Sequence, residues 1–239
     1  MHFGTDLFAA ELPLGAALGR MASANSRLRV HAETSDFEHL AREVLAGKLE
    51  FAVGDTAGAE RHPTRLAIEP VAEHRMFFFV RQGHPLVAAR EHSLETILVF
   101  PLVSPRLPQR MAVHLGKDAA HARVDRETGD LTPSLMVDSF AVARNAVMAG
   151  DAVGLAPLVA LEQDLRTREI SLLPFTAPWL QLSYGLFYTR KRPLSRVAQL
   201  FMTQLRQVEV VLQAREQRAL ARLDGKKRTR RSASKRKAK

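Results

Sequence analysis

Two short oxygen-bearing side chains, Asp138 and Ser139, stand where they can cap a helix and help to bind an anion. They precede an apolar segment at residues 140–149, and their oxygens can accept hydrogen bonds from the first N–H groups of a helix. Gly150 suits a left-handed residue just past the end of that helix. A capped helix N-terminus beside a buried strand attracts small anions. Residues 131–161 therefore fit either an anion site or an ordinary βαβ crossover, and the residues alone leave both interpretations open.

Other residue types that perform chemistry show no such pattern. The chain has no cysteine, which excludes disulfides, thiol nucleophiles and cysteine-ligated metals. Its nine histidines lack the His-x-x-x-His spacing that places two ligands on one helix face, so we expect no metal site. Neither a G-x-S-x-G motif nor a P-loop or dinucleotide-binding fingerprint occurs. We therefore expect no catalytic residue and no cofactor, although paired carboxylates for acid–base chemistry stay open.

The positive charge is concentrated at one end of the chain. Residues 226–239 hold nine Lys and Arg and no acid, so 35 less nine leaves 26 basic against 25 acidic groups in the rest. We expect this segment to be a disordered basic tail, because it has no apolar residue of any size to bury. It is either a solvated terminus or a weak, nonspecific nucleic-acid contact. The candidate contact residues are Lys226, Lys227, Arg228, Arg230 and Arg231.

The elements that position these groups alternate between strand and helix, which is typical of an α/β fold with a mostly parallel sheet. Pro13 is expected to kink the first helix or mark its start. Loops are predicted at residues 54–63 and 101–108, the second because it holds three prolines. The hydrophobic patterns predict helices at residues 7–24, 37–46, 109–116, 140–149 and 193–225, and strands at residues 2–3, 28–33, 49–53, 65–72, 76–81, 122–127, 153–156, 170–173 and 183–189.

Nothing in the sequence directs the chain to a membrane or out of the cell. Its apolar runs stay shorter than the ~18 residues that span a bilayer. The apolar N-terminal segment lacks the basic region of a signal peptide and is interrupted by Asp6, Glu11 and Pro13. We therefore expect a cytoplasmic protein.

Five segments, in this order, resemble the effector-binding domain of LysR-type transcriptional regulators. Together they cover most of residues 2–212, and their shared order is more specific than any one motif. The segments are GTDLFAAELPLGAALGRM, LRVHAETSDFEHLAREVLAGKLEFAVGD, VAEHRMFFFVRQGHPL, SFAVARNAVMAGDAVGLAPLVAL and LSYGLFYTRKRPLSRVAQLFMTQLR.

The resemblance implies a type-2 periplasmic-binding-protein-like α/β fold, in which two Rossmann-like subdomains are joined by two crossover strands. Subdomain I would comprise residues 1–79 plus 185–212, and subdomain II residues 80–184. Residues 213–225 would extend the last helix, before the tail at 226–239. Residues 76–81 and 183–190 would be the hinge strands.

The resemblance also implies a ligand between the lobes, among helix N-termini. A small-molecule effector is expected there, with a carboxylate as one candidate because Arg106 can hold one through two hydrogen bonds. Asp6 would instead repel an anion or act as a helix cap. The matching positions are Thr5, Asp6, Thr34, Ser35, Ser104, Arg106, Ser139 and Phe140.

We therefore expect the effector-sensing regulatory domain of a LysR-type transcriptional regulator and not an enzyme. Closure of the cleft on its ligand would modulate a homodimer or tetramer and so transcription. Regulators of this family bind DNA through an N-terminal winged helix-turn-helix and a linker helix. This sequence begins within the first strand of the resemblance, so we expect a fragment, a start assigned too late or a stand-alone sensing module. Two alternatives are a stand-alone cytoplasmic solute-binding protein of the same fold and, with less support, an enzyme built on it.

Overall fold

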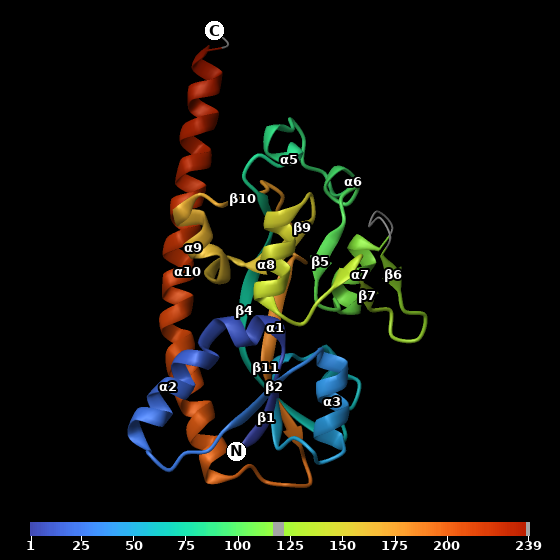
Figure 1. Cartoon of the computed structure of the whole chain (residues 1–239), viewed down its shortest axis with the longest axis vertical. Helices are drawn as coiled ribbons and strands as arrows, with labels where there is room; N and C mark the ends of the chain where they lie inside the picture. Colours follow the sequence, from blue (N-terminus) through green and yellow to red (C-terminus); the bar gives the residue numbers. More distant parts are fainter. Residues whose placement is uncertain (117–121, 238–239) are drawn as a thin grey trace.

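The computed structural model describes the backbone of residues 1–116 and 122–237, and the side chains of residues 1–116 and 122–223. It consists of two stacked α/β lobes with one long helix running beside both (Figure 1). Among the described residues, no helix is both long and apolar enough to cross a membrane.

A nine-stranded sheet runs through both lobes in the order β2-β1-β3-β11-β4-β9-β5-β8, with β10 paired to β4. In the lower lobe of Figure 1, β1, β2 and β3 are parallel and β11 is antiparallel to β3. In the upper lobe, β9, β5 and β8 are parallel. The strands are β1 (His2–Thr5), β2 (His31–Thr34), β3 (Phe51–Asp55), β4 (Leu66–Arg81), β5 (Leu102–Ser104), β6 (Arg123–Val124), β7 (Leu131–Thr132), β8 (Leu135–Met136), β9 (Val153–Pro157), β10 (Ile170–Leu172) and β11 (Gln181–Thr189).

The long strand β4 joins the lobes. It pairs with β11 through Arg75 and with β9 from Met76 onward, so the lobes divide at that point. The chain returns to the lower lobe just before β11, all of which pairs there. The divisions predicted at residues 79 and 184 therefore lie about four residues past the change of partner.

Two predicted strands, 65–72 and 76–81, are in fact the single strand β4. The hydrophobic pattern predicted a break between two strands because residues 73–75 are all polar. Their middle member, His74, is nevertheless buried, since two glutamates of the last helix meet its charge.

The first predicted helix, residues 7–24, is broken into three pieces. Leu12 has φ −92° and ψ −117°, outside the helical region, immediately before Pro13. Proline has no N–H to donate and its ring crowds the preceding turn, which explains the kink. The pieces are α1 (Leu7–Ala9), the π-helical η1 (Ala10–Leu14) and α2 (Gly15–Ala24).

Several helix ends follow the predicted cap chemistry, and others do not. Ser139 accepts a hydrogen bond from the first turn of α8, as expected, and Asp36 caps α3 in the same way. Gly150 is extended rather than left-handed, with φ −152°. The segments predicted as loops contain α4 and β5, which are too short to show the hydrophobic periodicity of a helix or a strand. The remaining short helices are α3 (Phe37–Leu45), α4 (Ala57–Glu60), α5 (Pro85–Ala88), α6 (Leu94–Ile97), α7 (Gln109–Leu115), α8 (Phe140–Ala149) and α9 (Leu158–Thr167).

The last helix, α10 (Arg196–Lys237), is 42 residues long, or about 63 Å at ~1.5 Å per residue. The sequence predicted its end at Gly225 and disorder from residue 226. The backbone instead continues as a helix to Lys237, because lysine, arginine and alanine are good helix formers and no proline follows. Near the start of α10, Phe201 packs in the core of the lower lobe, where its ring centroid is 5.0 Å from that of Phe3.

Candidate functional site

The junction between the lobes collects polar residues that follow the carboxyl ends of parallel strands. In α/β sheets such loops are the usual place for a ligand. In the lower lobe, Asp6, Asp36 and Asp55 stand at the ends of β1, β2 and β3. In the upper lobe, β5 ends at Ser104 and leads to Arg106.

Each of the three aspartates is tied to backbone N–H groups. Asp6 accepts from Ala9 N at 2.7 Å and from Asp55 N at 2.5 Å. Asp36 accepts from the first turn of α3, and Asp55 accepts from Ala57 N at 2.9 Å. Burial raises the pKa of Asp6 to about 6, although these backbone hydrogen bonds oppose the shift. The carboxylates are therefore held in place before any ligand arrives.

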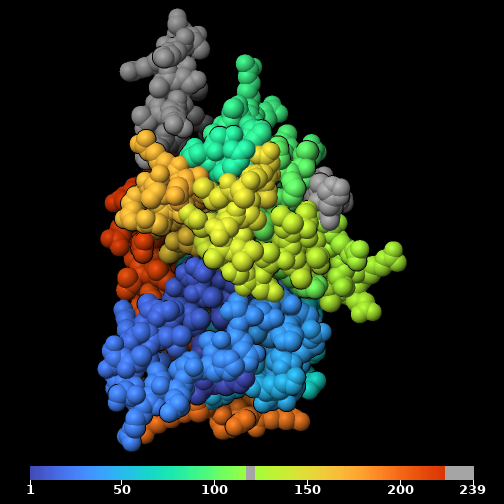
Figure 2. All heavy atoms as spheres, viewed as in Figure 1, coloured from blue at the N-terminus to red at the C-terminus, as the bar shows by residue number. Residues whose placement is uncertain are grey.

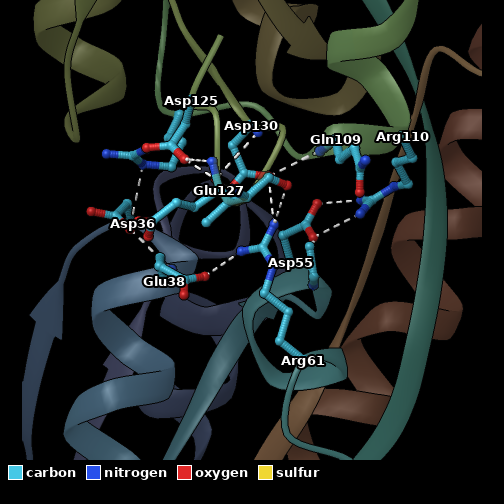
Figure 3. Close-up of polar contacts among 12 residues, drawn as sticks. Asp36, Glu38, Asp55, Arg61, Gln109, Arg110, Asp125, Glu127 and Asp130 are labelled. Atoms are coloured by element: carbon cyan, nitrogen blue, oxygen red, sulfur yellow. Dashed lines mark hydrogen bonds and ion pairs between the residues drawn. The ribbon is translucent and has the colours of Figure 1, made fainter.

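A pair of hydrogen bonds between Arg110 and Asp55 joins the two lobes (Figure 3). Arg110 lies on α7 of the upper lobe, and its Nη1 is 2.9 Å from Asp55 Oδ1. Burial raises the pKa of Asp55 even though Arg110 opposes that shift. Desolvation alone would lower the pKa of Arg110, but the hydrogen bond and charge of Asp55 outweigh it and raise the value. Both charges are stabilised by this contact between lobes.

Arg61 makes a second connection between the lobes (Figure 3). It follows α4 in the lower lobe and is also bonded to Glu38 there. Its Nη2 donates to Asp130 Oδ1 at 2.7 Å and to the carbonyl of Thr128 at 3.3 Å, both in the upper lobe. Asp130 is fully buried and also accepts from Gln109 N at 3.0 Å. This contact fixes the upper-lobe loop that precedes β7.

Arg106 makes the third and loosest connection. Its Nε lies 3.9 Å from Asp36 Oδ1, beyond hydrogen-bond distance. The Nε atom is buried, and it makes no hydrogen bond with the described part of the chain. Asp138 lies nearby, and its pKa is raised by burial and by the charge of Asp36, while Arg106 opposes the shift. The Nε of Arg106 is therefore a buried, charged donor without a hydrogen-bond acceptor among the described residues.

A small cavity lies between these contacts. Its volume is ≈ 20 Å³, about enough for one water molecule and far below the roughly 300–1,000 Å³ of small-molecule pockets. Atoms of the two lobes meet along their junction on the face shown in Figure 2. The structure therefore represents a closed arrangement of the lobes. The lining residues are Asp6, Phe8, Asp36, Phe37, Asp55, Met76, Pro105, Arg106, Leu107, Pro108, Met111 and Leu182.

Of the eight residues predicted to bind a ligand, Asp6 and Arg106 line this cavity. Thr5 and Ser104 are buried, and the hydroxyl of each donates a hydrogen bond to the carbonyl oxygen of the residue that follows it in the chain. Ser139 is exposed and accepts from Val142 N at 3.5 Å. The other three lie outside the cavity wall: Thr34 is exposed, Ser35 is half-buried and Phe140 packs in the core.

Three members of this site, Asp36, Asp55 and Arg110, were not predicted from the sequence. Asp55 was detectable in principle, because it lies at the carboxyl end of a buried apolar strand, next to which Asp6 stands at the end of β1. Arg110 was not, because its partner lies 55 residues earlier and only the packing of the two lobes brings them together.

Comparison with known proteins supports the architecture. Residues 2–209 match the family of LysR substrate binding domains. The SDS degradation transcriptional activation protein of Pseudomonas sp. is 29% identical over 188 residues, which make up 77% of this chain and 58% of that protein. The chain therefore spans less than two thirds of the length of this relative.

Solved structures of regulatory domains share the fold. A double Cys-to-Ser mutant of the MetR regulatory domain from Neisseria meningitidis has a TM-score of 0.65 and 13% identity, covering 88% of this chain and 95% of that one. The cofactor-binding domain of the Cbl transcriptional regulator has a TM-score of 0.63 and 15% identity, covering 86% of each chain. A reduced form of OxyR from N. meningitidis has a TM-score of 0.61 and 16% identity, covering 87% and 94%.

These likenesses confirm the predicted fold class. The family and the fold are those of transcriptional-regulator domains, not of enzymes. On the match over residues 2–209, the chain belongs to the LysR substrate-binding domain family.

Proposed function

We propose that this chain is the effector-sensing, non-enzymatic domain of a LysR-type transcriptional regulator, and that its effector binds between the lobes. The observation that carries the proposal is the interlobe cavity, whose wall includes Arg106 with a buried Nε that makes no hydrogen bond to the described residues. A buried donor left without an acceptor costs about 1–3 kcal/mol. A ligand that supplies the acceptor recovers that cost.

We infer an effector with an anionic head and an apolar body. The wall also holds three aspartates, but each already accepts hydrogen bonds from backbone N–H groups, whereas the Nε of Arg106 has no such partner among the described residues. Arg106 can bind the head, a carboxylate or a sulfate, in place of the distant Asp36. The relative from Pseudomonas sp. is named for the degradation of SDS, itself an amphiphilic anion. Apolar side chains form much of the remaining wall: Phe8, Phe37, Met76, Leu107, Met111 and Leu182.

Entry of such a molecule requires the lobes to separate, because ≈ 20 Å³ has no room for it. The connections made by Arg61, Arg106 and Arg110 must then loosen, and the lobes reclose around the ligand. The effector shifts the lobe angle only as far as its affinities for the open and closed arrangements differ. Ligand-driven closure thus remains the proposed signal.

A thermal-shift series tests this site in the full chain. Octanoate and octyl sulfate, below their micelle concentrations, are compared with octanol and octylammonium. At about 100 times its Kd a ligand adds roughly 2.7 kcal/mol of stability. For a chain of this size that is a rise in Tm of about 5–10 °C. The anions should produce it and the neutral and cationic analogues should not.

Arg106→Gln should abolish the shift, whereas Arg90→Gln is the matched control. Arg90 is exposed and does not line the cavity, so its replacement should leave the shift intact. An equal shift in Arg106→Gln, or an equal response to octylammonium, would contradict the assignment of the anion site. The other six residues stay predicted contacts, and an opened cleft would have to expose the three that are buried, Thr5, Ser104 and Phe140. The remaining three are Thr34, Ser35 and Ser139.

A second proposal concerns the end of α10, where we infer weak, nonspecific contact with nucleic acid through Lys226, Lys227, Arg228, Arg230 and Arg231. Next to them along α10, a groove of ≈ 620 Å³ against α9 is lined by four arginines, of which Arg215 is paired with Glu162. A row of cations binds phosphates without reading bases. The arginines of the groove are Arg166, Arg215, Arg218 and Arg222.

Fluorescence anisotropy with a short DNA duplex at several salt concentrations tests this contact. Truncation after Gly225 should weaken binding and flatten its salt dependence, because fewer counterions are released. Unchanged binding after truncation would eliminate the tail as a contact.

Self-association and location complete the proposal. We propose a homodimer or tetramer in the cytoplasm, where a transcriptional regulator acts. Large apolar side chains on α10, Leu200, Val210 and Val211, are exposed and offer a surface for a second copy. Light scattering of the full chain measures the assembly, and a monomer at all concentrations would refute it.

A further inference from the structure

Two histidines and a glutamate meet on β1 and β2 of the lower lobe, outside the lining of the interlobe cavity. Strands β1 and β2 are parallel neighbours, and His2 stands directly opposite His31 in their register. Glu33 follows His31 by two residues, so its side chain projects from the same face of the strand. The pairing therefore places three metal-binding side chains on one face.

The ligand atoms of these three residues converge. His2 Nε2 lies 2.5 Å from Glu33 Oε1, and His31 Nδ1 lies 4.0 Å from the same oxygen. One ligand atom from each residue falls within 4.8 Å of the others. The two imidazole rings are stacked, with centroids 4.5 Å apart and planes 3° from parallel. Two nitrogen bases are thus directed at a single carboxylate.

From this convergence we propose that His2, His31 and Glu33 bind one divalent transition-metal ion, of which Zn²⁺ is the best fit. Two imidazoles and a carboxylate form a known zinc ligand set, with a fourth position left for water. At metal–ligand distances of about 2.0–2.2 Å, tetrahedral ligand atoms are roughly 3.4 Å apart. The three side chains are 39%, 70% and 41% exposed, so small rotations can bring them to that spacing.

The backbone keeps the ligands close without a metal. Met1 N donates to the carbonyl of Arg29 at 3.1 Å, and His31 N donates to the carbonyl of Met1 at 3.0 Å. These bonds hold the start of β1 against β2, so the metal would meet a partly formed site and join the edge strand to its neighbour. Because the imidazoles must be neutral to bind, affinity falls in acid.

The spacing of the histidines predicted no metal site, because no two of them share a helix face. The ligands lie on different strands, 29 residues apart in the chain for the histidine pair. Only the parallel register of β1 and β2 brings them together. This inference is independent of the proposed effector site, because none of the three residues lines the interlobe cavity.

Calorimetric titration of the full chain with ZnCl₂, and the visible spectrum with Co²⁺, test the site. We expect one equivalent of metal and a tetrahedral cobalt spectrum. His31→Gln and Glu33→Gln should each weaken binding by roughly 10-fold or more, since even groups that only orient a ligand contribute that much. Zn²⁺ should raise the Tm of the wild-type chain and not that of His31→Gln.

His62→Gln is the matched control, because His62 is a half-buried histidine of the lower lobe outside the cluster. It should retain full affinity. Absence of stoichiometric binding would overturn the proposal. So would binding that is lost in His2→Gln but kept in His31→Gln and Glu33→Gln, because the Met1 amine and His2 would then chelate the metal by themselves.

Discussion

Replacing His74 with glutamine should lower the free energy of unfolding by about 3–5 kcal/mol, the usual cost of leaving buried charges without their partner. His74 lies on β4 and is 1% exposed. Its Nε2 is 3.0 Å from Glu209 Oε1 and its Nδ1 is 2.6 Å from Glu216 Oε2, both on α10. Tyr184 of β11 also donates its hydroxyl to Glu209. Glutamine would leave two buried carboxylates facing an uncharged group.

The pH dependence gives a second estimate of the same contribution. Burial by itself would lower the pKa of His74, but the hydrogen bonds and charges of Glu209 and Glu216 outweigh it and raise the value from 6.5 to about 9. A difference of about 2.5 between the pKa of His74 in the folded and unfolded states corresponds to about 3 kcal/mol of free energy of unfolding. Because the folded pKa is the higher one, this stability is fully present below pH 6.5 and is lost as the pH rises through 9.

Urea denaturation at intervals from pH 6 to pH 10 measures both effects. The wild-type chain should lose stability between pH 6.5 and 9, and His74→Gln should lack that component. Its Tm at pH 7 should fall by roughly 6–20 °C. Adding Glu209→Gln and Glu216→Gln should restore part of the loss by removing the unpaired charges. Identical pH profiles for the wild type and His74→Gln would refute the reasoning.

Two further substitutions test packing and lobe contact. Gly154→Ala should destabilise the chain by about 1–3 kcal/mol in urea denaturation, because a Cβ there would overlap the Phe79 ring. Its control, Gly19→Ala, places a methyl group in open space on a helix and should stabilise by about 1 kcal/mol. Asp55→Asn should raise the radius of gyration in small-angle scattering by weakening a bond between lobes, whereas Asp151→Asn, which breaks a bond within the upper lobe, should not.

The sequence predicted the elements whose ends carry local chemical signals. Ser139 marked the start of α8, and its side chain caps that helix as predicted. The sequence did not predict elements whose formation depends on contacts between residues far apart in the chain. A strand in the proline-rich loop at residues 101–108 forms because β5 pairs with β9 and β8, neither of which is adjacent in the chain.

The residues of the candidate site also fall into those that the sequence predicted and those that it did not. Asp6 and Arg106, which line the cavity, were predicted because a family resemblance supplied the three-dimensional arrangement that sequence spacing lacks. The Asp55–Arg110 bond and the His2–His31 pair depend on register between segments far apart in sequence. Local patterns carry no information on such register, so those residues appeared as ordinary surface or loop positions.

Helix α10 restrains the opening that the effector site needs, because it is attached to both lobes. In the lower lobe Phe201 packs on the core, and at the junction Glu209 and Glu216 hold His74, one residue before β4 reaches its last pair with β11. In the upper lobe, Arg215 pairs with Glu162 of α9. Separation of the lobes must therefore bend α10 or break this last contact.

Arg215→Gln should then make opening easier without touching the cavity. Arg215 is 55% exposed and its pair with Glu162 is worth at most about 1 kcal/mol, so the fold should survive the change. Combined with Asp55→Asn, it should expand the chain more in small-angle scattering than Asp55→Asn does alone, since two restraints on one motion are coupled. Equal expansion in the single and double variants would mean that α10 moves with the upper lobe as a rigid unit. The proposed signal of effector binding would then have to pass through β4 and β11, the strands that Glu209 of α10 contacts through His74 and Tyr184.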